Sequence, residues 1–342
     1  MNYYVGIDIG GTKIATVVAD KNFNILNKKR FLTAETKLPL KSIERIVENI
    51  DIQLKEMAIT KEDILGIGIS CGGPLNSREG VILSPPNLPG WDNVNIIEIL
   101  KSSFNTKIYL QNDANACALA EWKLGAGKGF ENLVFLTFGT GMGAGLILNN
   151  KLYCGKQDCA GEVGHIRLNT TGPVGFGKAG SFEGYCSGGG IVKLGEIFLK
   201  EELAEGYSGP LKEKYERGSI EAKDILTLAF EGDVLSKKII DESARRLGQG
   251  LSILIDILNP EAIVIGSIYS RCENLFKSIV DLILEKECIE QSLNGCKIVP
   301  AELSENVGDL AAIIVASGEY WKYKKLQILC CNFFNFLTKT CY

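Results

Sequence analysis

Residues 4–20 read YVGIDIGGTKIATVVAD, and this stretch decides the fold. Apolar side chains fill Tyr3–Ile9, a glycine turn follows, and a second apolar run covers Ile14–Asp20. Short apolar runs bounded by turn residues are typical of buried strands. We therefore expect two strands joined by a glycine turn, with a third strand at Phe23–Leu32 that completes an antiparallel meander.

The same pattern returns at residues 133–150, LVFLTFGTGMGAGLILNN, as a weak internal duplication. Elsewhere strand-like and helix-like segments are mixed along the chain, which favours the α/β class. We expect further strands at 64–70, 107–111, 262–267 and 297–303, and helices at 41–57, 114–124, 237–258 and 308–323.

The composition is that of a soluble globular protein, with 342 residues, 46% hydrophobic, 23% charged and a net charge of −4. This acidic balance disfavours a nucleic-acid partner, which would need clustered Lys and Arg. The N-terminus shows no signal peptide, and no run reaches the roughly 18 apolar residues of a membrane span. We therefore expect a cytoplasmic protein that does not bind membranes, whose 11 cysteines are reduced thiols.

The C-terminal segment, residues 326–342, differs from the rest because it is apolar, aromatic and rich in cysteine. It is too short to span a bilayer. We expect a disordered terminal extension, and a partner-binding or membrane-surface tail is the alternative.

The first glycine turn, DIGGTK at residues 8–13, suits phosphate although it is not a Walker loop. Gly10 and Gly11 let the backbone approach a ligand closely, while Thr12 and the amide groups of the turn can donate to phosphate oxygens. Asp8 can hold magnesium directly or through water, and Lys13 adds a cation. Taken alone, the motif is also compatible with a plain hairpin turn.

The second turn, GTGMGAG at residues 139–145, offers the same chemistry through Gly139, Thr140, Gly141 and Gly143. A transferred phosphoryl group needs positioning and charge neutralisation more than covalent help. Two such turns, one in each half of the chain, therefore predict binding of a nucleotide's phosphates from both sides.

Residues 3–323 resemble the ROK family of bacterial sugar kinases and repressors, within the superfamily of sugar kinases, actin and heat-shock ATPases. The resemblance rests on the motifs GIDIGGTK, NLPGW, QNDANACALAEW, LTFGTGMGAGLIL, GEVGH and SFEGYCSGG, in the family's order. It implies an actin-like ATPase, or ribonuclease H-like, α/β fold with a nucleotide–sugar cleft between two domains. The implied domains are 1–113 plus 308–325, and 114–307.

Asn112 and Asp113 come at the end of a predicted strand, just before a helix. On local grounds an Asp at this place is an ordinary helix N-cap. The resemblance implies instead that Asp113 is the catalytic base, which would also contact the sugar, and that Asn112 binds sugar beside it. It also implies sugar contacts from Gly73 and from Asn87 in a proline-rich loop.

The only histidine, His165, follows Glu162 in GEVGH and precedes Glu183. In the family, three cysteines and this histidine bind a structural zinc, but here Val174, Phe176 and Ser181 occupy the cysteine positions. Val and Phe offer no ligand atom, so no zinc is expected. We expect Glu162, His165 and Glu183 to bind sugar hydroxyls. The alternatives are a histidine that only supports the site, and a zinc held by Cys154, Cys159, Cys186 and His165.

Near the C-terminus, Gly266 matches the glycine turn that covers adenosine in the family, although Ser267 replaces the second glycine. Together these matches imply an ATP-dependent hexokinase or glucokinase-type phosphotransferase that uses magnesium and forms a homodimer. Glucose is the first substrate expected, with mannose, fructose, allose or an N-acetylhexosamine as alternatives. A sugar sensor without catalysis is a second class of function. A repressor is disfavoured, because the first phosphate strand leaves no room for a preceding DNA-binding domain.

Overall fold

The structure is a computed structural model that describes residues 2–320. The chain forms two compact units. Unit 1 comprises residues up to Ala120, Ile147–Cys159 and the described residues from Glu305 onward, and unit 2 comprises Glu121–Leu146 and Ala160–Ser304. The domain limits expected from the sequence stay a prediction, and the expected terminal extension at 326–342 lies outside the described residues.

Unit 1 is built on a five-stranded sheet in the order β3-β2-β1-β4-β8. The strands are β1 (Tyr3–Ile9), β2 (Lys13–Asp20), β3 (Ile25–Leu32), β4 (Ile64–Cys71) and β8 (Ile108–Asn112). β1 to β3 form the predicted antiparallel meander, while β1, β4 and β8 run parallel. Since the carboxyl ends of parallel strands meet at one edge, that edge is the expected place for a ligand.

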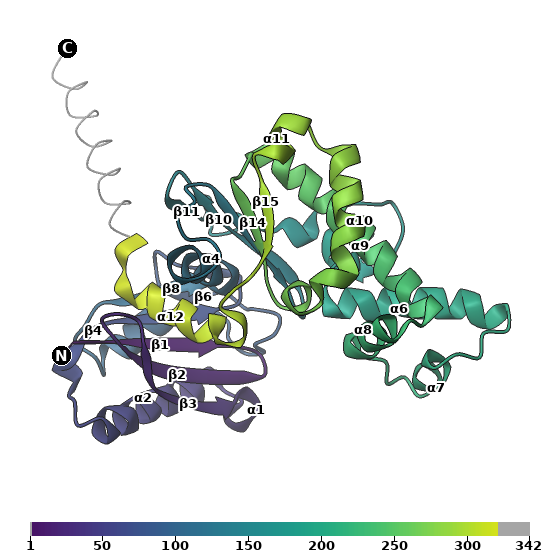
Figure 1. Ribbon diagram of the computed structural model, residues 1–342. Helices are drawn as coiled ribbons and strands as arrows, with labels where there is room; N and C mark the ends of the chain where they lie inside the picture. The colour runs from purple at the N-terminus through teal and green to yellow at the C-terminus, as the bar shows by residue number, and fades with distance from the viewer. Residues whose placement is uncertain (1, 321–342) are drawn as a thin grey trace, which may run out of the picture. The chain divides into compact units, whose positions relative to one another are not determined.

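Two helices cover the opposite faces of this sheet (Figure 1). Helix α2 (Pro39–Glu56) buries Ile43, Ile46 and Ile50 against it. Helix α12 (Val307–Ser317) lies so close to β4 that an added Cβ at Gly68 would fall 2.1 Å from the Ala312 carbonyl oxygen. The glycine in β4 therefore fixes how near the last helix sits.

The last helix is interrupted within the span that the sequence pattern predicts. Helix α12 stops at Ser317, because Gly318 adopts a left-handed conformation with φ of +61° and caps it. Residues 319 and 320 are helical again, and the predicted end at residue 323 lies outside the described residues.

Smaller elements complete unit 1. They are α1 (Thr33–Thr36), η1 (Lys61–Asp63), α3 (Ile96–Lys101) and a small sheet of β5 (Leu75–Asn76), β6 (Val81–Ile82) and β7 (Val94–Asn95). The first residues of α4 (Asp113–Leu124) also belong to this unit.

The second five-stranded sheet has the order β11-β10-β9-β14-β15. Its strands are β9 (Leu133–Phe138), β10 (Met142–Leu148), β11 (Lys151–Tyr153), β14 (Ala262–Ile265) and β15 (Lys297–Pro300). A strand, a glycine turn and a return strand begin both sheets, and two further strands follow in the same order. This repeated order confirms the internal duplication.

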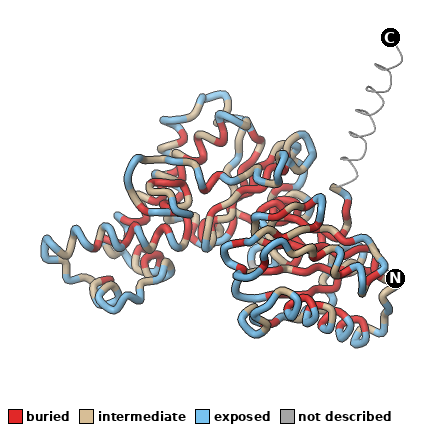
Figure 2. Tube along the Cα trace, turned by 180° about the vertical axis from the view of Figure 1, so that it is seen from behind, coloured by how far each residue is buried: buried red, intermediate tan, exposed pale blue. Residues whose placement is uncertain are grey.

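Strand β11 and the last residues of β10 fall in the Ile147–Cys159 segment of unit 1. Outside the other strands of this sheet, helices make up most of unit 2. They are α5 (Phe182–Tyr185), α6 (Gly188–Ala204), α7 (Leu211–Glu216), α8 (Ala222–Glu231), α9 (Val234–Leu258), α10 (Ile268–Glu287) and α11 (Glu290–Asn294). Figure 2 shows buried residues running along the strands and along the inner faces of the helices. None of the helices among residues 2–320 combines the length and the apolar character that crossing a membrane would require.

A buried carboxylate organises the loop after α4. The side chain of Glu121 is fully buried, and its oxygens accept hydrogen bonds from the backbone N–H groups of Ala126, Glu302 and Leu303 at 2.9, 3.2 and 2.9 Å. Glu121 therefore ties the entry of β9 to the segment that follows β15.

Replacing Glu121 by Gln tests this role. The new amide group would face backbone N–H groups that need an acceptor, so we expect a loss of roughly 2 kcal/mol in the free energy of unfolding. Denaturant unfolding of Glu121→Gln and of the exposed control Glu131→Gln would measure it. Equal stability of the two variants would contradict the assignment.

Candidate functional site

The first glycine turn is an ordered and exposed hairpin in unit 1. The N–H of Gly10 donates to the carbonyl oxygen of Lys13 at 3.0 Å, and the Thr33 hydroxyl donates to the carbonyl of Gly10 at 2.7 Å. Gly11, Thr12 and Lys13 remain exposed. The turn is thus held from behind while its outer side is open to a ligand.

Asn87 lies directly against this turn. An added Cβ at Gly11 would fall 2.5 Å from the Asn87 carbonyl oxygen, so only glycine fits there. The loop that carries Asn87 is fixed by hydrogen bonds of 2.9 Å from Ser84 N to Trp91 O and from Leu88 N to Pro85 O. The structure therefore brings together Gly11 and Asn87, which the sequence assigned to phosphate and to sugar.

The start of α4 shows which polar residue caps the helix. The side-chain oxygen of Asn112 accepts from the N–H groups of Ala114 and Asn115 at 3.0 and 3.3 Å, as an N-cap does. Gln111, which the sequence analysis missed, accepts from the N–H of Asn112 at 2.9 Å and so supports that cap. The local interpretation of Asp113 as the cap was therefore wrong.

Asp113 keeps a carboxylate oxygen directed away from the helix. Its Oδ1 accepts from the N–H of Ala114 at 2.8 Å, whereas Oδ2 lies 3.8 Å from the Cβ position of Gly72 at the end of β4. Water reaches the side chain, yet the surrounding protein desolvates it enough to raise the pKa of Asp113. Gly73 lies nearby, and a Cβ added to it would fall 3.3 Å from the side-chain amide nitrogen of Asn112.

Asp8, near the carboxyl end of β1, lies in an excess of negative charge. Burial, followed by the nearby carboxylates of Asp113 and Asp309, raises the pKa of Asp8 to about 6, against opposing effects of Lys13 and Lys28. Among the described residues no hydrogen-bond donor reaches its carboxylate. A cation beside Asp8 would neutralise the excess negative charge and give the carboxylate a partner.

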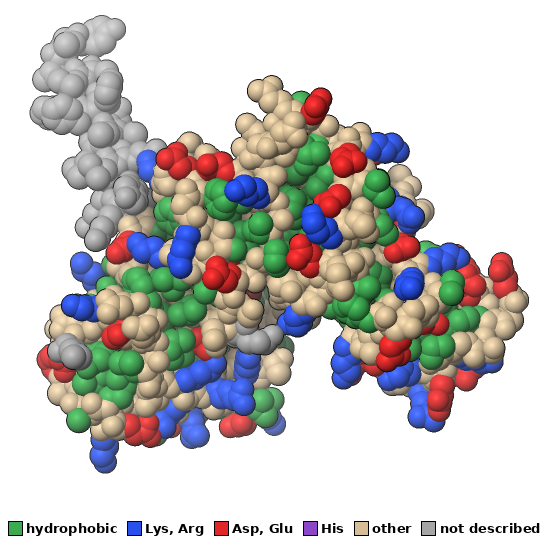
Figure 3. All heavy atoms as spheres, viewed as in Figure 1, with side chains coloured by type: hydrophobic (Ala, Val, Ile, Leu, Met, Phe, Trp, Pro, Cys, Tyr) green, Lys and Arg blue, Asp and Glu red, His purple; other side chains and the backbone are tan. Residues whose placement is uncertain are grey.

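A small cavity of about 100 Å³ adjoins Asp8 at the N-terminal end of α12. Lys13, Lys28 and Arg30 line it, together with Asp309, which forms an ion pair with Lys28. Figure 3 shows Lys and Arg side chains gathered over β2 and β3. Lys28, Arg30 and Asp309 were not predicted as site residues, although the alternation of polar residues along β3 is a signal that Lys28 and Arg30 share a face.

These residues fit a magnesium ion bound with a nucleotide. Magnesium is usually held by one or two carboxylates, with water and phosphate oxygens as the other ligands. Asp8 offers such a carboxylate, and a bound cation would offset the burial and the neighbouring carboxylates that raise its pKa. No group of three metal-ligating side chains is found among residues 2–320, and a site of this kind does not need one.

The second glycine turn is fastened to Glu183 within unit 2. The Glu183 carboxylate accepts from the N–H of Met142 at 3.0 Å, and a Cβ at Gly141 would fall 2.9 Å from the same oxygen. The N–H of Gly143 donates to the Thr137 hydroxyl at 2.9 Å. Glu183, expected to bind sugar, therefore also shapes the turn that was expected to bind phosphate.

Glu162 and His165 also lie near the start of β10, because Gly164 between them packs tightly there. A Cβ at Gly164 would fall 2.3 Å from the Met142 carbonyl oxygen and 3.2 Å from the Cβ of Glu183. Both Glu162 and His165 are exposed. The structure thus groups Glu162, His165 and Glu183 around the start of β10.

The residues near His165 do not fit a zinc ion. Val174 and Phe176 carry no ligand atom, and the Ser181 hydroxyl accepts from the N–H of Gly184 at 3.1 Å as the cap of α5. The alternative set of zinc ligands includes Cys186, but this thiol donates to the Ser243 carbonyl. Burial raises the pKa of the Cys186 thiol well above its ordinary value. Zinc ligation would require the thiolate.

The other two cysteines of that alternative set also have partners. Cys154 lies 3.8 Å from the amide nitrogens of Gln111 and Asn115, and the Cys159 thiol donates to the Gln157 carbonyl at 3.3 Å. No cluster in the described chain replaces the missing zinc ligands.

Gly266 and Ser267 lie beside the second glycine turn. The N–H of Gly266 donates to the Leu136 carbonyl at 2.9 Å, and a Cβ at Gly139 would fall 3.3 Å from the Ser267 hydroxyl. Ser267 adopts a φ of +57°, a conformation that glycine takes without strain. The backbone thus keeps the form expected of a double glycine although the second glycine is absent.

Replacing Asp8 by Asn is expected to stabilise the ligand-free protein near pH 8. The raised pKa means that the folded state disfavours the carboxylate. This penalty is absent below the unfolded pKa of 3.8, grows as the pH rises to about 6, and is constant above it. Asp8→Asn should therefore add up to about 3 kcal/mol to the free energy of unfolding near pH 8.

Denaturant unfolding across pH would measure this gain, with the exposed Asp92→Asn as control. The gain should shrink as the pH falls from 6 toward 3.8. A destabilised Asp8→Asn protein near pH 8 would contradict the assignment.

Comparison with known proteins agrees with this geometry. The model of the ROK family matches residues 4–319. A glucokinase of Streptomyces coelicolor is 33% identical over 274 residues, covering 78% of this chain and 82% of that protein. A xylose repressor of Caldicellulosiruptor bescii is 30% identical over 312 residues, covering 90% of this chain and 76% of the repressor.

Solved structures agree as well. The crystal structure of a ROK family glucokinase from Streptomyces griseus, in complex with glucose and AMPPNP, matches with a TM-score of 0.71 and 28% identity. The match covers 92% of this chain and 99% of that one. The chain therefore belongs to the ROK family and has the two-domain actin-like ATPase fold of the family's kinases.

Proposed function

We propose that the protein is an ATP-dependent sugar kinase that transfers the γ-phosphoryl group of Mg-ATP to a hydroxyl group of a hexose. The observation that supports this proposal most strongly is the environment of the Asp113 carboxylate. Its carboxylate is not the helix cap, its pKa is raised, and it shares an edge of the sheet with Asp8 and the first glycine turn. A repressor would need sugar binding but not this base.

In the proposed reaction Asp113 accepts the proton of the sugar hydroxyl, which we take to be the 6-hydroxyl. The hydroxyl oxygen forms a bond to the γ-phosphorus as the bond from that phosphorus to the β-bridging oxygen breaks, which releases ADP. A carboxylate whose pKa is raised by desolvation holds a proton more strongly than an ordinary one and is therefore the stronger base.

Charge neutralisation falls to the residues around the cavity at α12. A magnesium ion, when bound with ATP, would supply positive charge to the phosphate oxygens. Lys13, Lys28 and Arg30 add positive charge on the same side of unit 1, and the N–H groups of the exposed Gly11 and Thr12 can donate to phosphate oxygens. Asp8 is the carboxylate that would hold the ion.

Unit 2 would contribute the other substrate contacts. We assign the backbone of Gly139, Thr140, Gly141 and Gly143 to phosphate and Gly266 to the nucleoside. We assign Glu162, His165 and Glu183 to sugar hydroxyls, in addition to Asn87, Asn112 and Gly73 from unit 1. Carboxylates suit polyols because each oxygen accepts a hydrogen bond without needing to donate one.

Glucose is the first acceptor to test, because glucokinases are among the relatives and one solved relative is in complex with glucose. Mannose, fructose, allose and N-acetylhexosamines are the next candidates, since sugars that differ at one hydroxyl need direct comparison. Magnesium dependence, a cytoplasmic location and homodimerisation belong to the same proposal.

Replacing Asp113 by Asn tests the proposal directly. Purified protein with Mg-ATP and a panel of hexoses should release ADP in a sugar-dependent manner. Asp113→Asn should lower kcat by at least about 100-fold, the smaller figure for loss of a general base, while sugar still binds. Asp281→Asn, at the surface of α10, should behave as the wild type.

One result would contradict the kinase activity, and another would contradict only the role of Asp113. If sugar bound tightly but no hexose stimulated ADP release, the protein would be a sensor. If Asp113→Asn retained full activity, Asp113 would not be the base.

Replacing Gly11 by Ala tests the contact between the phosphate turn and the sugar loop. The added Cβ would fall 2.5 Å from the Asn87 carbonyl oxygen, so the two segments must separate. We expect the KM values for ATP and for the hexose to rise together, each by roughly tenfold, because a shift of about 1 Å can cost up to about 100-fold.

Steady-state kinetics with Gly295→Ala as the matched control would show this effect, since a Cβ at Gly295 meets no atom closer than 3.6 Å. A rise in only one of the two KM values would contradict the coupling of the turn to the loop.

A further inference from the structure

Residues 174–179, which include two of the positions where the family carries zinc-binding cysteines, form a hairpin with an unusual turn. Strands β12 (Val174–Gly175) and β13 (Lys178–Ala179) pair antiparallel with Gly175 opposite Lys178, so Phe176 and Gly177 form a two-residue turn. Phe176 has a φ of +43° and Gly177 a φ of +74°. Two-residue turns with both φ values positive strongly prefer Asn, Asp or Gly at the first position.

Phe176 therefore adopts a backbone conformation that a bulky side chain disfavours. Burial does not compensate, because 68% of the Phe176 side chain is exposed. An exposed aromatic residue in a strained turn is a reason to look for a function at that residue.

The neighbour of Phe176 is His165. The two rings lie perpendicular to one another with their centroids 5.8 Å apart. Since His165 is itself exposed, the two rings form the sides of one open corner. The corner offers an apolar face from Phe176 and hydrogen-bonding nitrogens from His165.

Long basic side chains hold the hairpin in place. The Lys178 ammonium donates to the His165 carbonyl at 2.7 Å, the Lys193 ammonium to the Val174 carbonyl at 2.6 Å, and the Arg167 guanidinium to the Ala179 carbonyl at 2.7 Å. The first of these bonds joins the hairpin to the backbone of His165. The corner is thus fixed from both sides.

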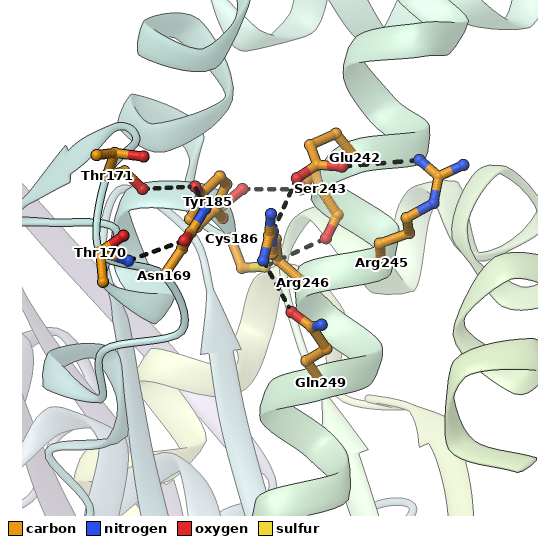
Figure 4. A network of polar contacts seen from close by, with 10 residues as sticks. All are labelled: Asn169, Thr170, Thr171, Tyr185, Cys186, Glu242, Ser243, Arg245, Arg246 and Gln249. Carbon is orange, nitrogen blue, oxygen red and sulfur yellow. Dashed lines mark hydrogen bonds and ion pairs between the residues drawn. The ribbon is translucent and has the colours of Figure 1, made fainter. Parts of the chain in front are cut away.

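The chain just before the hairpin is anchored to helix α9 through Tyr185 (Figure 4). The Tyr185 hydroxyl donates to the Thr171 carbonyl at 3.0 Å, and the Ser243 hydroxyl donates to the Tyr185 carbonyl at 2.8 Å. The Arg246 guanidinium lies over the Tyr185 ring at 4.8 Å and pairs with Glu242 at 2.8 Å. Phe176 is therefore presented on a rigid support.

We propose that Phe176 is a specificity-determining residue that packs its ring against the C–H face of the acceptor sugar, while His165 binds a hydroxyl of the same sugar. This inference rests on the proposed sugar kinase function. A hexose has polar edges and an apolar face formed by its C–H groups, which matches a corner made of one aromatic ring and one imidazole. Strain in the turn is retained because the ring contacts the substrate.

The decisive variant is Phe176→Asn, because Asn suits the turn but removes the ring. We expect the melting temperature of the ligand-free protein to rise, since the turn loses its strain. We expect the KM for the hexose to rise about tenfold through the loss of apolar contact, with kcat and the KM for ATP changed less than about twofold. Phe176→Tyr should keep the KM near the wild-type value.

Val174→Ala is the matched control, because Val174 is exposed on the same hairpin away from the turn. It should leave the KM for the hexose unchanged. An equal rise in KM for Val174→Ala and Phe176→Asn would mean that the hairpin acts only as a whole, and an unchanged KM for Phe176→Asn would overturn the proposal outright.

A double-mutant cycle separates direct contact from support of His165. If Phe176 touches the sugar, calorimetric titration of the hexose should show that Phe176→Asn still weakens binding in a His165→Asn background. If Phe176→Asn has no further effect in that background, the ring acts only through His165 and the proposal fails.

Titration of the wild-type protein distinguishes this inference from the kinase proposal. Sugar binding that depends on Phe176 without ADP release would support the corner and refute the kinase. Absence of any sugar binding would refute both, even if Phe176→Asn raised the melting temperature.

Discussion

Negative charge concentrated at the carboxyl edge of the first sheet determines how the candidate site can bind phosphate and magnesium. The carboxylates of Asp113 and Asp309 repel that of Asp8 there, and this repulsion adds to burial in raising the pKa of Asp8 to about 6. Such an arrangement costs stability in the free protein and is relieved when cations arrive. Lys13 of β2 and Lys28 and Arg30 of β3 offset part of this negative charge. The negative charge that remains suits a magnesium ion that accompanies phosphate.

Several backbone segments of the candidate site approach one another closely, and glycine makes this possible. Gly11 lets the phosphate turn touch the loop of Asn87, and Gly68 lets α12 press onto β4, which brings Gly308 against Asp8. In unit 2, Gly141 and Gly164 allow Glu183 and the segment of His165 to pack on the start of β10. The groups assigned to phosphate and to sugar are therefore coupled mechanically within each unit.

The sequence predicted what depends on local pattern. Apolar runs broken by glycine turns specified the first meander and the first two strands of the second sheet, and the family motifs specified the fold and family that the comparisons confirm. It could not show that Asn112 rather than Asp113 caps α4, because both residues suit a cap. It could not find the pair of Lys28 and Asp309, since α12 brings together residues 281 positions apart. The strain at Phe176 likewise becomes visible only once the turn has dihedral angles.

Identification of the phosphorylated product distinguishes a sugar kinase from an ATPase or a sugar-binding protein. Phosphorus NMR of the protein incubated with Mg-ATP and glucose, then with each alternative hexose, distinguishes a sugar phosphate from inorganic phosphate. We expect a new phosphomonoester signal on the 6-hydroxyl of at least one hexose, which is absent with Asp113→Asn. Release of inorganic phosphate alone, or no reaction with any sugar that binds, would contradict it.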